Sequence, residues 1–283
     1  MDTQSLIPLA EILRPKKIKD IVGQDHILGE GQSLRVAIDS ENLPSIILWG
    51  PPGVGKTTIA RVIANNVEAQ FIALSAVLSG VKEIRESVQK AEFASEQHNK
   101  KTILFIDEVH RFNKSQQDAF LPHIESGLIT FIGATTENPS FEVNSALLSR
   151  CQIYVLKPLS LEPLSEIISK VIDEYKKISI DDLARDMILT YANGDARRLI
   201  NLLEMLINSL KPNVDGNINK ELVEKIVSNK VRKFDKGGEQ FYDQISAMHK
   251  SVRGSNPDAS VYWLLRMLDG GADPLYLARR ILR

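Results

Sequence analysis

Short apolar runs separated by segments of helical character mark the first half of the chain. Residues 45–49, 102–106 and 129–134 are long enough for buried strands and too short for typical helices. Residues 58–64, between the first two runs, have helical character. Alternating strands and helices are typical of a parallel sheet with helices on both faces, which binds its ligand at the carboxyl ends of the strands. The pattern predicts an α/β fold over residues 1–157.

The hydrophobic pattern changes after Lys157, where two prolines, Pro158 and Pro163, bracket a new start. From there to Val231 the periodicity is helical and predicts an all-α region. Five apolar residues form one stripe that we expect in its core: Leu199, Leu202, Leu203, Leu206 and Ile207. The charged stretch around Gly237-Gly238 predicts a linker, and further helical patterning follows it. We therefore expect three regions, residues 1–157, 158–231 and 232–283.

The clearest chemical motif follows the first apolar run. Residues 50–57 read Gly-Pro-Pro-Gly-Val-Gly-Lys-Thr and fit G-x-x-x-x-G-K-[ST] without a mismatch. A Gly-rich surface turn is the competing interpretation, but the strand before it and the helix after it favour a phosphate-binding loop. In such a loop the backbone N–H groups face the phosphates, Lys56 reaches the β- and γ-phosphates, and the Thr57 hydroxyl binds Mg²⁺. The residues expected to contact nucleotide are Pro52, Gly53, Val54, Gly55, Lys56, Thr57 and Thr58.

The second apolar run ends in the acidic pair Asp107 and Glu108. Strands often end in solvated acids, so the pair indicates a nucleotide site only in combination with Lys56 earlier in the chain. Asp107 is expected to bind Mg²⁺, and Glu108 is expected to polarise the attacking water. Because a nucleotide kinase or a GTP switch has less need of a base beside the metal ligand, the pair favours a hydrolysing ATPase. The predicted cofactors are ATP and Mg²⁺.

The third apolar run ends in two hydroxyl residues, Thr135 and Thr136. A hydroxyl there could contact the γ-phosphate or the attacking water, and we favour Thr136 for this sensing role, with Thr135 as the alternative. Threonine is common in ordinary strands, so the assignment depends on its position after the two nucleotide motifs.

Together with residues 147–151, which read Leu-Leu-Ser-Arg-Cys, these motifs resemble those of AAA+ ATPases of the clamp-loader type. The resemblance implies an AAA+ phosphate-loop sheet flanked by helices, an all-α lid, and the start of a helical C-terminal domain. It also implies that Arg150 is an arginine finger that projects into the nucleotide site of a neighbouring subunit. A planar, permanently charged guanidinium suits that role because it neutralises charge that develops on the transferred phosphoryl group.

Two further segments resemble nucleotide contacts of the same ATPases. Residues 191–198 resemble the lid signature whose arginine contacts nucleotide from the same chain; Arg197 fits this position, and Arg198 is the alternative. Residues 13–16 and 20–24 resemble the segment that wraps the adenine, with contacts expected near Val22 and Gly23.

The resemblance narrows to the replication-associated recombination protein A family. It is carried by residues 9–23, 108–114 and 136–141, and above all by the segments 241–255 and 273–280, which clamp-loader subunits and branch-migration motors lack. It implies a DNA-dependent ATPase at stalled or gapped replication forks, which acts in recombination and DNA repair. Family relatives form a homotetramer, and single-strand-binding protein is an expected partner.

The length of the chain bears on the expected assembly. Relatives in the family continue well past the position of Arg283, so we expect this chain to be a fragment with an incomplete oligomerisation domain. If such fragments do not assemble, each nucleotide site lacks the Arg150 finger of a neighbour, and hydrolysis should fall by orders of magnitude.

Net charge gives no support for nucleic-acid binding, because 35 Lys and Arg residues face 36 Asp and Glu residues. Any DNA contact must come from local patches. Two candidate patches are Lys225, Lys230, Arg232, Lys233 and Lys236, and Arg279, Arg280 and Arg283 at the carboxyl end. Ordinary solvated surface is an equally good interpretation of both.

The single cysteine, Cys151, excludes a disulfide framework or a cysteine-based zinc site within one chain. No apolar run approaches membrane-spanning length, and the amino end lacks a signal-peptide core. We expect a cytoplasmic, nucleoid-associated protein.

Two other functions compete with the fork ATPase. A sliding-clamp loader ATPase subunit would share the nucleotide motifs but lack the block from 241 to 280. A non-catalytic scaffold would bind nucleotide only to set its shape; the intact set of Lys56, Asp107 and Glu108 argues against it, since a scaffold need not retain a hydrolytic acid.

Overall fold

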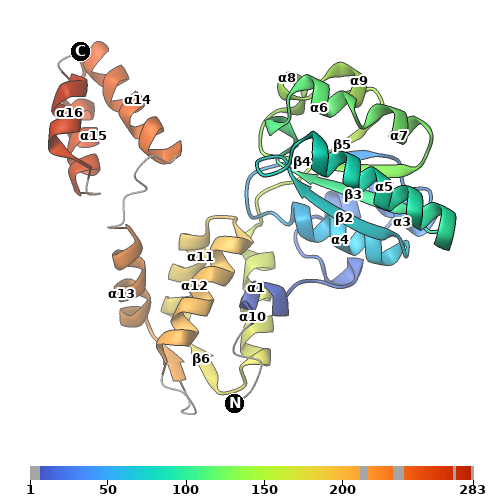
Figure 1. The fold of residues 1–283 in the computed structure, drawn as a ribbon. Coiled ribbons are helices and arrows are strands. Elements are labelled where there is room, and N and C mark those ends of the chain that lie inside the picture. The colour runs from blue at the N-terminus through green and yellow to red at the C-terminus, as the bar shows by residue number, and fades with distance from the viewer. Residues whose placement is uncertain (1–6, 211–215, 232–238, 270–271, 282–283) are drawn as a thin grey trace. The chain divides into compact units, whose positions relative to one another are not determined.

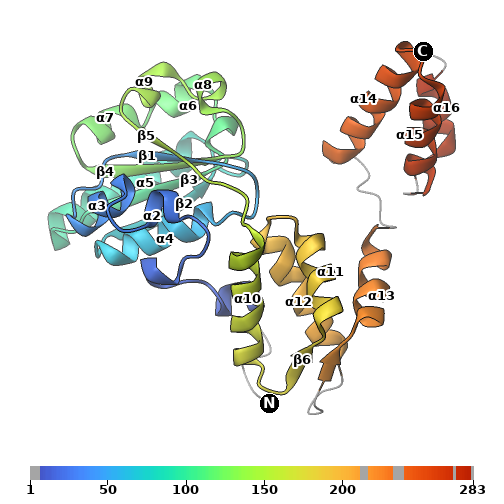
Figure 2. The same ribbon diagram turned by 180° about the vertical axis from the view of Figure 1, so that it is seen from behind.

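The computed structural model describes residues 7–210, 216–231, 239–269 and 272–281 (Figures 1 and 2). Contacts along the chain divide it into two compact units, Met1–Ser179 with Arg185–Gly216, and Ile180–Ala184 with Asn217–Arg283. The expected linker at Gly237-Gly238 lies outside the described residues. The three-region division of the sequence stays a prediction about domain organisation.

The first unit contains a five-stranded parallel sheet with the strand order β2-β3-β4-β1-β5. The strands are β1 (Ile46–Trp49), β2 (Gln70–Ser75), β3 (Thr102–Asp107), β4 (Ile129–Thr135) and β5 (Gln152–Val155). The three strands predicted from apolar runs, β1, β3 and β4, occupy the centre of the sheet. The two strands that the pattern missed, β2 and β5, are its edges, and most of their residues are half-buried or exposed.

Helices cover both faces of this sheet, as Figures 1 and 2 show from opposite sides. Successive strand residues point to opposite faces, so Ile46 and Leu48 of β1 join one buried cluster and Ile47 joins another. The face of Ile46 packs against helices that precede or follow β1, namely α2 (Asp25–Leu28), α3 (Ser33–Asp39) and α4 (Lys56–Asn66). The face of Ile47 packs against α5 (Val81–His98), η3 (Val109–Arg111), α7 (Leu121–Glu125) and α9 (Ser145–Leu148). Two further short helices, α6 (Lys114–Asp118) and α8 (Pro139–Glu142), precede α7 and α9 in the chain. The predicted α/β fold with flanking helices is therefore confirmed.

The carboxyl ends of the three central strands, β1, β3 and β4, lie side by side at the same end of the sheet. Trp49, the last residue of β1, pairs with Thr135, the last residue of β4. On the other side of β4, Ile106 of β3 pairs with Gly133, so Asp107 also lies at this end of the sheet. The loop from β1 to α4, the acidic pair and the threonine pair thus lie together because parallel strands share a direction.

A helical part completes the first unit. Its helices are α1 (Leu9–Ile12), α10 (Leu161–Glu174), the greater part of α11 (Asp182–Ala192) and α12 (Ala196–Ser209). The short helix η2 (Ile18–Asp20) instead buries Ile18 in the cluster that contains Ile46 of the sheet. Four residues of the predicted stripe, Leu199, Leu202, Leu203 and Leu206, are fully buried in α12, and Ile207 is half-buried. The Glu204 carboxylate of α12 accepts a hydrogen bond of 2.8 Å from the Leu9 N–H, which fixes α1 against α12.

Two short strands, β6 (Ile178–Ile180) and β7 (Gly216–Ile218), form a separate two-stranded sheet. The second unit contains α13 (Lys220–Val231), α14 (Glu239–Arg253), α15 (Pro257–Asp269) and α16 (Pro274–Ile281). Its core joins the last three helices through Ile245, Met248, Met267, Ala272 and Leu277. Among the residues that the structure describes, no helix has the length and apolar character needed to span a bilayer.

A row of aromatic rings fixes the helices of the α6–α9 layer to the sheet. The Phe120 ring centroid lies 5.9 Å from that of Phe112 and 5.5 Å from that of Phe131 on β4. All three side chains are buried.

Replacing Phe120 with alanine should lower the free energy of unfolding by about 3 to 5 kcal/mol, because the site cannot collapse around the lost ring. Phe141→Ala is the matched control, since that ring is 84% exposed, and it should change stability by less than about 0.5 kcal/mol. Urea unfolding followed by circular dichroism measures both; equal effects of the two substitutions would contradict this account of the core.

Candidate nucleotide-binding site

The phosphate loop, residues 50–57, connects β1 to α4 and depends on two glycines with left-handed backbone. Gly53 has φ +73° and Gly55 has φ +98°, values that side-chain-bearing residues rarely adopt. A Cβ atom at Gly53 would lie 1.8 Å from Asp195 Oδ1, whereas one at Gly55 would meet no atom within 4 Å. The loop is therefore packed on one side and open on the other, where α4 begins at Lys56 with its N–H groups available for an anion.

Lys56 lies inside the curve of this loop. Its side chain is almost buried, and Nζ donates hydrogen bonds to the carbonyl oxygens of Gly50 at 2.7 Å and Pro51 at 2.9 Å. Burial lowers the pKa of Lys56, and the nearby carboxylates of Glu108 and Asp107 act in the opposite direction. The two carbonyl oxygens thus hold Lys56 Nζ inside the loop.

The acidic pair lies at the carboxyl end of β3. Asp107 is the last strand residue, and Glu108 has left-handed backbone with φ 55° and ψ 47°. For a residue with a side chain this conformation is costly, and such residues concentrate at functional sites. Both carboxylates line the same cavity as the phosphate loop.

The two threonines at the end of β4 have different surroundings. The Thr136 hydroxyl lies 3.4 Å from Glu108 Oε2, and its side chain is half-buried. The Thr135 side chain is fully buried, and its hydroxyl lies 2.9 Å from His110 Nδ1 and 3.0 Å from the Glu137 backbone nitrogen. Thr136 thus contacts Glu108, whereas Thr135 contacts His110; which of the two senses the γ-phosphate stays a prediction.

The cavity has a polar and an apolar part. The polar part has a volume of about 230 Å³ and is lined by Ala10, Arg14, Pro52, Gly53, Gly55, Lys56, Thr57, Thr58, Asp107, Glu108, Ala196, Arg197 and Ile200. The second part, of about 110 Å³, is lined mainly by aliphatic side chains, with Asp20 and Lys170 also in its wall. The aliphatic residues are Leu13, Pro15, Ile21, Val22, Val54, Leu159 and Ile167. Both parts share Ala10, Arg14, Gly55, Thr58, Ala196 and Ile200, so they are continuous. A polar cradle joined to an apolar slot suits a nucleotide, with phosphates in the first and base in the second.

Val22 lines the apolar part, as expected for an adenine contact. Gly23 is not among the lining residues. It packs instead against the next segment, because a Cβ atom there would lie 2.5 Å from Leu159 Cδ2, and its φ of +75° requires glycine. Gly23 thus packs behind the lining residue Leu159 and does not itself line the cavity.

The start of α12 is joined to the phosphate loop. The Ala196 N–H donates to the Gly53 carbonyl at 3.0 Å, and Asp195 Oδ1 caps the helix by accepting from the Arg198 N–H at 2.8 Å. Arg197 lines the cavity, whereas the Arg198 guanidinium carbon lies 5.8 Å from the centre of the Tyr191 ring. The geometry favours Arg197 over Arg198 for a nucleotide contact.

Arg150 does not line this chain's own cavity. It follows α9, forms an ion pair with Glu125 of α7, and donates from Nη1 to the Ala146 carbonyl at 2.7 Å. Its expected action on a neighbouring subunit stays a prediction.

Two residues near the phosphates were not assigned roles from the sequence. Arg14 lines both parts of the cavity and is held by Glu11, with Nη2 2.7 Å from Glu11 Oε2. His110 contacts both Glu108 and Thr135. Arg14 could have been found from the adenine segment that contains it, whereas the contact of His110 with Thr135 links residues 25 positions apart and has no local signal.

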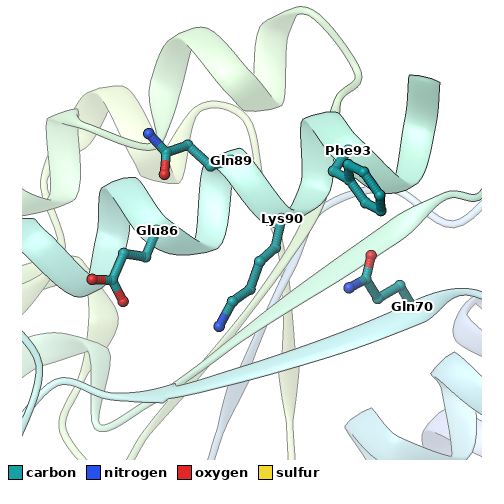
Figure 3. Close-up of a pocket in the computed structure, with 5 residues that line it drawn as sticks. All are labelled: Gln70, Glu86, Gln89, Lys90 and Phe93. Atoms are coloured by element: carbon teal, nitrogen blue, oxygen red, sulfur yellow. The ribbon is translucent and has the colours of Figure 1, made fainter. Parts of the chain in front are cut away.

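A second hollow, of about 330 Å³, lies between α5 and the edge strand β2 (Figure 3). Its lining residues are Gln70, Glu86, Gln89, Lys90 and Phe93. None of them lines the cavity at the phosphate loop, and none belongs to a nucleotide motif. We therefore assign it no part in nucleotide binding.

The expected DNA-contact patches are only partly described. Lys225 and Arg279 are exposed, and the Arg280 guanidinium carbon lies 5.2 Å from the centre of the Tyr276 ring. Arg232, Lys233, Lys236 and Arg283, and the side chain of Lys230, lie outside the described residues.

Three family models match successive parts of the chain. Residues 46–159 match the ATPase family associated with various cellular activities (AAA), residues 174–253 an AAA C-terminal domain, and residues 254–283 an MgsA AAA+ ATPase C-terminal model.

Curated relatives cover the chain from end to end. A Coxiella burnetii protein named replication-associated recombination protein A is 51% identical over 100% of this chain and 65% of its own length. The protein of that name from Escherichia coli K12 is 50% identical over 97% of this chain and 63% of its own length. The chain thus spans less than two thirds of these relatives.

Solved structures include a similar fold. The RuvB Holliday junction branch migration motor of Thermotoga maritima is 26% identical, with a TM-score of 0.67, over 92% of this chain and 86% of that one.

Gly53→Ala should abolish nucleotide binding, because its Cβ would overlap the Asp195 carboxylate and move the loop away from α12. Gly31→Ala is the matched control, since Gly31 has a similar φ of +76° and a Cβ there would meet nothing within 4 Å. Titration with a fluorescent ATP analogue measures both. An unchanged dissociation constant for Gly53→Ala would show that the contact between loop and α12 does not shape the site.

Proposed function

The chain belongs to the replication-associated recombination protein A family of AAA+ ATPases, and on that premise we propose that it binds ATP with Mg²⁺ and hydrolyses it to ADP and phosphate. One observation carries the proposal: the phosphate loop, Asp107, Glu108 and Arg197 line a single cavity that continues into an apolar slot. The phosphate loop, Asp107 and Glu108 lie together because β1 and β3 end on the same side of the parallel sheet, and Arg197 comes from α12.

The loop supplies the phosphate cradle in this proposal. Lys56 Nζ exchanges the carbonyl oxygens of Gly50 and Pro51 for phosphate oxygens, while the first N–H groups of α4 face the same anion. The Thr57 hydroxyl and the Asp107 carboxylate are hard oxygen ligands of the kind that Mg²⁺ prefers, and both line the polar part of the cavity. Bound Mg²⁺ would neutralise charge on the β- and γ-phosphates.

Glu108 acts as the base. Its carboxylate accepts a proton from water as the water oxygen forms a bond to the γ-phosphorus and the bond to the bridging oxygen of ADP breaks. The proton then passes to solvent. Thr136, 3.4 Å from Glu108 Oε2, is placed to sense the γ-phosphate or hold the water, and Arg197 to contact the phosphates from α12.

Arg150 completes the site of a neighbouring subunit in an assembled homo-oligomer, for which the family expectation is a tetramer. The Arg150 side chain would have to exchange Glu125 for the neighbour's γ-phosphate. Because such fingers contribute roughly 10³- to 10⁵-fold to turnover, subunits that do not assemble should hydrolyse ATP slowly.

The biological role that we propose is DNA-dependent hydrolysis at stalled or gapped replication forks, in replication-associated recombination and repair. Family membership and the names of the relatives support it. DNA with single-stranded regions would be the nucleic-acid partner and single-strand-binding protein a protein partner, in the cytoplasm at the nucleoid. With near-zero net charge, DNA contact must come from local groups such as Lys225, Arg279 and Arg280.

Glu108→Gln should bind ATP as tightly as the parent chain and lose turnover by about 10²- to 10⁴-fold, because an amide cannot take a proton from water. Phosphate release measured with and without forked or gapped DNA tests this, with ATP affinity measured in parallel. Turnover that DNA stimulates in the parent chain and that disappears in the variant supports a DNA-dependent ATPase.

Other outcomes of the same assay favour the alternatives. ATP binding without hydrolysis in either protein, with or without DNA, would favour the nucleotide-gated scaffold. Stimulation by a sliding clamp rather than by forked DNA would favour a clamp-loader subunit. Unchanged turnover in Glu108→Gln would remove Glu108 from the mechanism.

A further inference from the structure

His110 is a buried histidine that touches the proposed base. It belongs to η3, directly after β3 and Glu108, and its side chain is only 7% exposed. Nε2 lies 3.3 Å from Glu108 Oε2, and Nδ1 lies 2.9 Å from the Thr135 hydroxyl oxygen. Both ring nitrogens thus have a polar partner, one at the end of β3 and the other at the end of β4.

The partners of Thr135 determine where the ring protons lie. The Thr135 hydroxyl lies 3.2 Å from the Glu137 carbonyl oxygen, to which it can donate, and it accepts from the Glu137 N–H at 3.0 Å. A hydroxyl has one proton and two lone pairs, so it either donates to the carbonyl and accepts from Nδ1–H, or donates to Nδ1. An ionised carboxylate only accepts. The second arrangement fits both neighbours of a neutral ring: Nδ1 accepts from the Thr135 hydroxyl, and the single ring proton, on Nε2, faces Glu108 Oε2.

The two polar contacts of Glu108 fall on the same oxygen. His110 Nε2 and the Thr136 hydroxyl both approach Oε2, at 3.3 and 3.4 Å. Oε1 is then the oxygen left to accept a proton from water. The contacts with His110 and Thr136 thus leave Oε1 facing away from both partners of the carboxylate.

We propose that His110 is a positioning residue for ATP hydrolysis: it holds Oε2 of Glu108 and anchors that carboxylate to Thr135 on β4, the strand that ends beside the sensor Thr136. This proposal rests on the proposed ATPase function. The contacts made by the His110 ring thus join the base to the end of β4.

Three substitutions separate this role from a merely structural one. The amide nitrogen of glutamine can take the place of Nε2, and that of asparagine the place of Nδ1. His110→Gln thus keeps the donor to Glu108, His110→Asn keeps only the contact with Thr135, and His110→Ala keeps neither.

We expect His110→Ala and His110→Asn to lower kcat for Mg·ATP by about 10- to 100-fold with KM within about twofold of the parent chain. His110→Gln should stay within about threefold of the parent kcat. Thermal melting of each variant checks that it is folded. The proposal would be overturned if His110→Asn kept the parent kcat while His110→Gln lost it. It would also be overturned if the decrease in kcat paralleled the decrease in melting temperature in all three variants.

A second readout does not depend on turnover. In ¹⁵N–¹H spectra of the imidazole groups, assigned by the signal that His110→Gln removes, His110 Nε2–H should exchange slowly with water and shift when Glu108 becomes glutamine. The proposal would be overturned if the Nε2–H exchanged rapidly with water, or if the chemical shift of the His110 signal were the same in Glu108→Gln as in the parent chain. If the parent chain does not hydrolyse ATP, the ATPase proposal fails, and this spectrum still decides whether His110 holds Glu108.

Discussion

The contact between the phosphate loop and the first turn of α12 is the constraint on which the site depends. The Gly53 carbonyl accepts the Ala196 N–H, and the Asp195 carboxylate that caps α12 occupies the space where any side chain at position 53 would lie. The loop that would bind phosphates and the helix that carries Arg197 are therefore one packed structure. A change in the loop on nucleotide binding must move α12, or be resisted by it, and this gives a physical route from the nucleotide to the helical part of this unit.

A second constraint is electrostatic. Burial makes the charged form of Lys56 more costly, while Glu108 and Asp107 favour that form, so the cation and the two anions stabilise each other in this cavity. Phosphates would bring more negative charge to the same place, where Lys56, Arg14 and Arg197 can meet it. The strained backbone of Glu108 fits this arrangement, because the surrounding contacts, including those of His110 and Thr136, determine the direction of its carboxylate.

The comparison of sequence and structure shows which features local patterns determine. The central strands β1, β3 and β4 could be predicted because both of their faces are covered and their residues are continuously apolar. The edge strands β2 and β5 were not predicted, although their apolar runs, residues 71–74 and 153–156, are as long as that of β1, because no nucleotide motif follows them in the sequence. In the site, the phosphate loop and the acidic pair are contiguous motifs and were found, and both line one cavity. The Glu108–His110–Thr135 network was not, because it depends on two strands meeting in space.

The central claim is that this cavity binds the phosphates of ATP through Lys56. The most direct test is a crystal structure of the chain with a non-hydrolysable ATP analogue and Mg²⁺. The account predicts that Lys56 Nζ leaves the Gly50 and Pro51 carbonyls for the β- and γ-phosphates, with Thr57 and Asp107 near the metal and the base in the slot beside Val22. Nucleotide bound elsewhere, or Lys56 still bonded to the two carbonyls with nucleotide present, would contradict it.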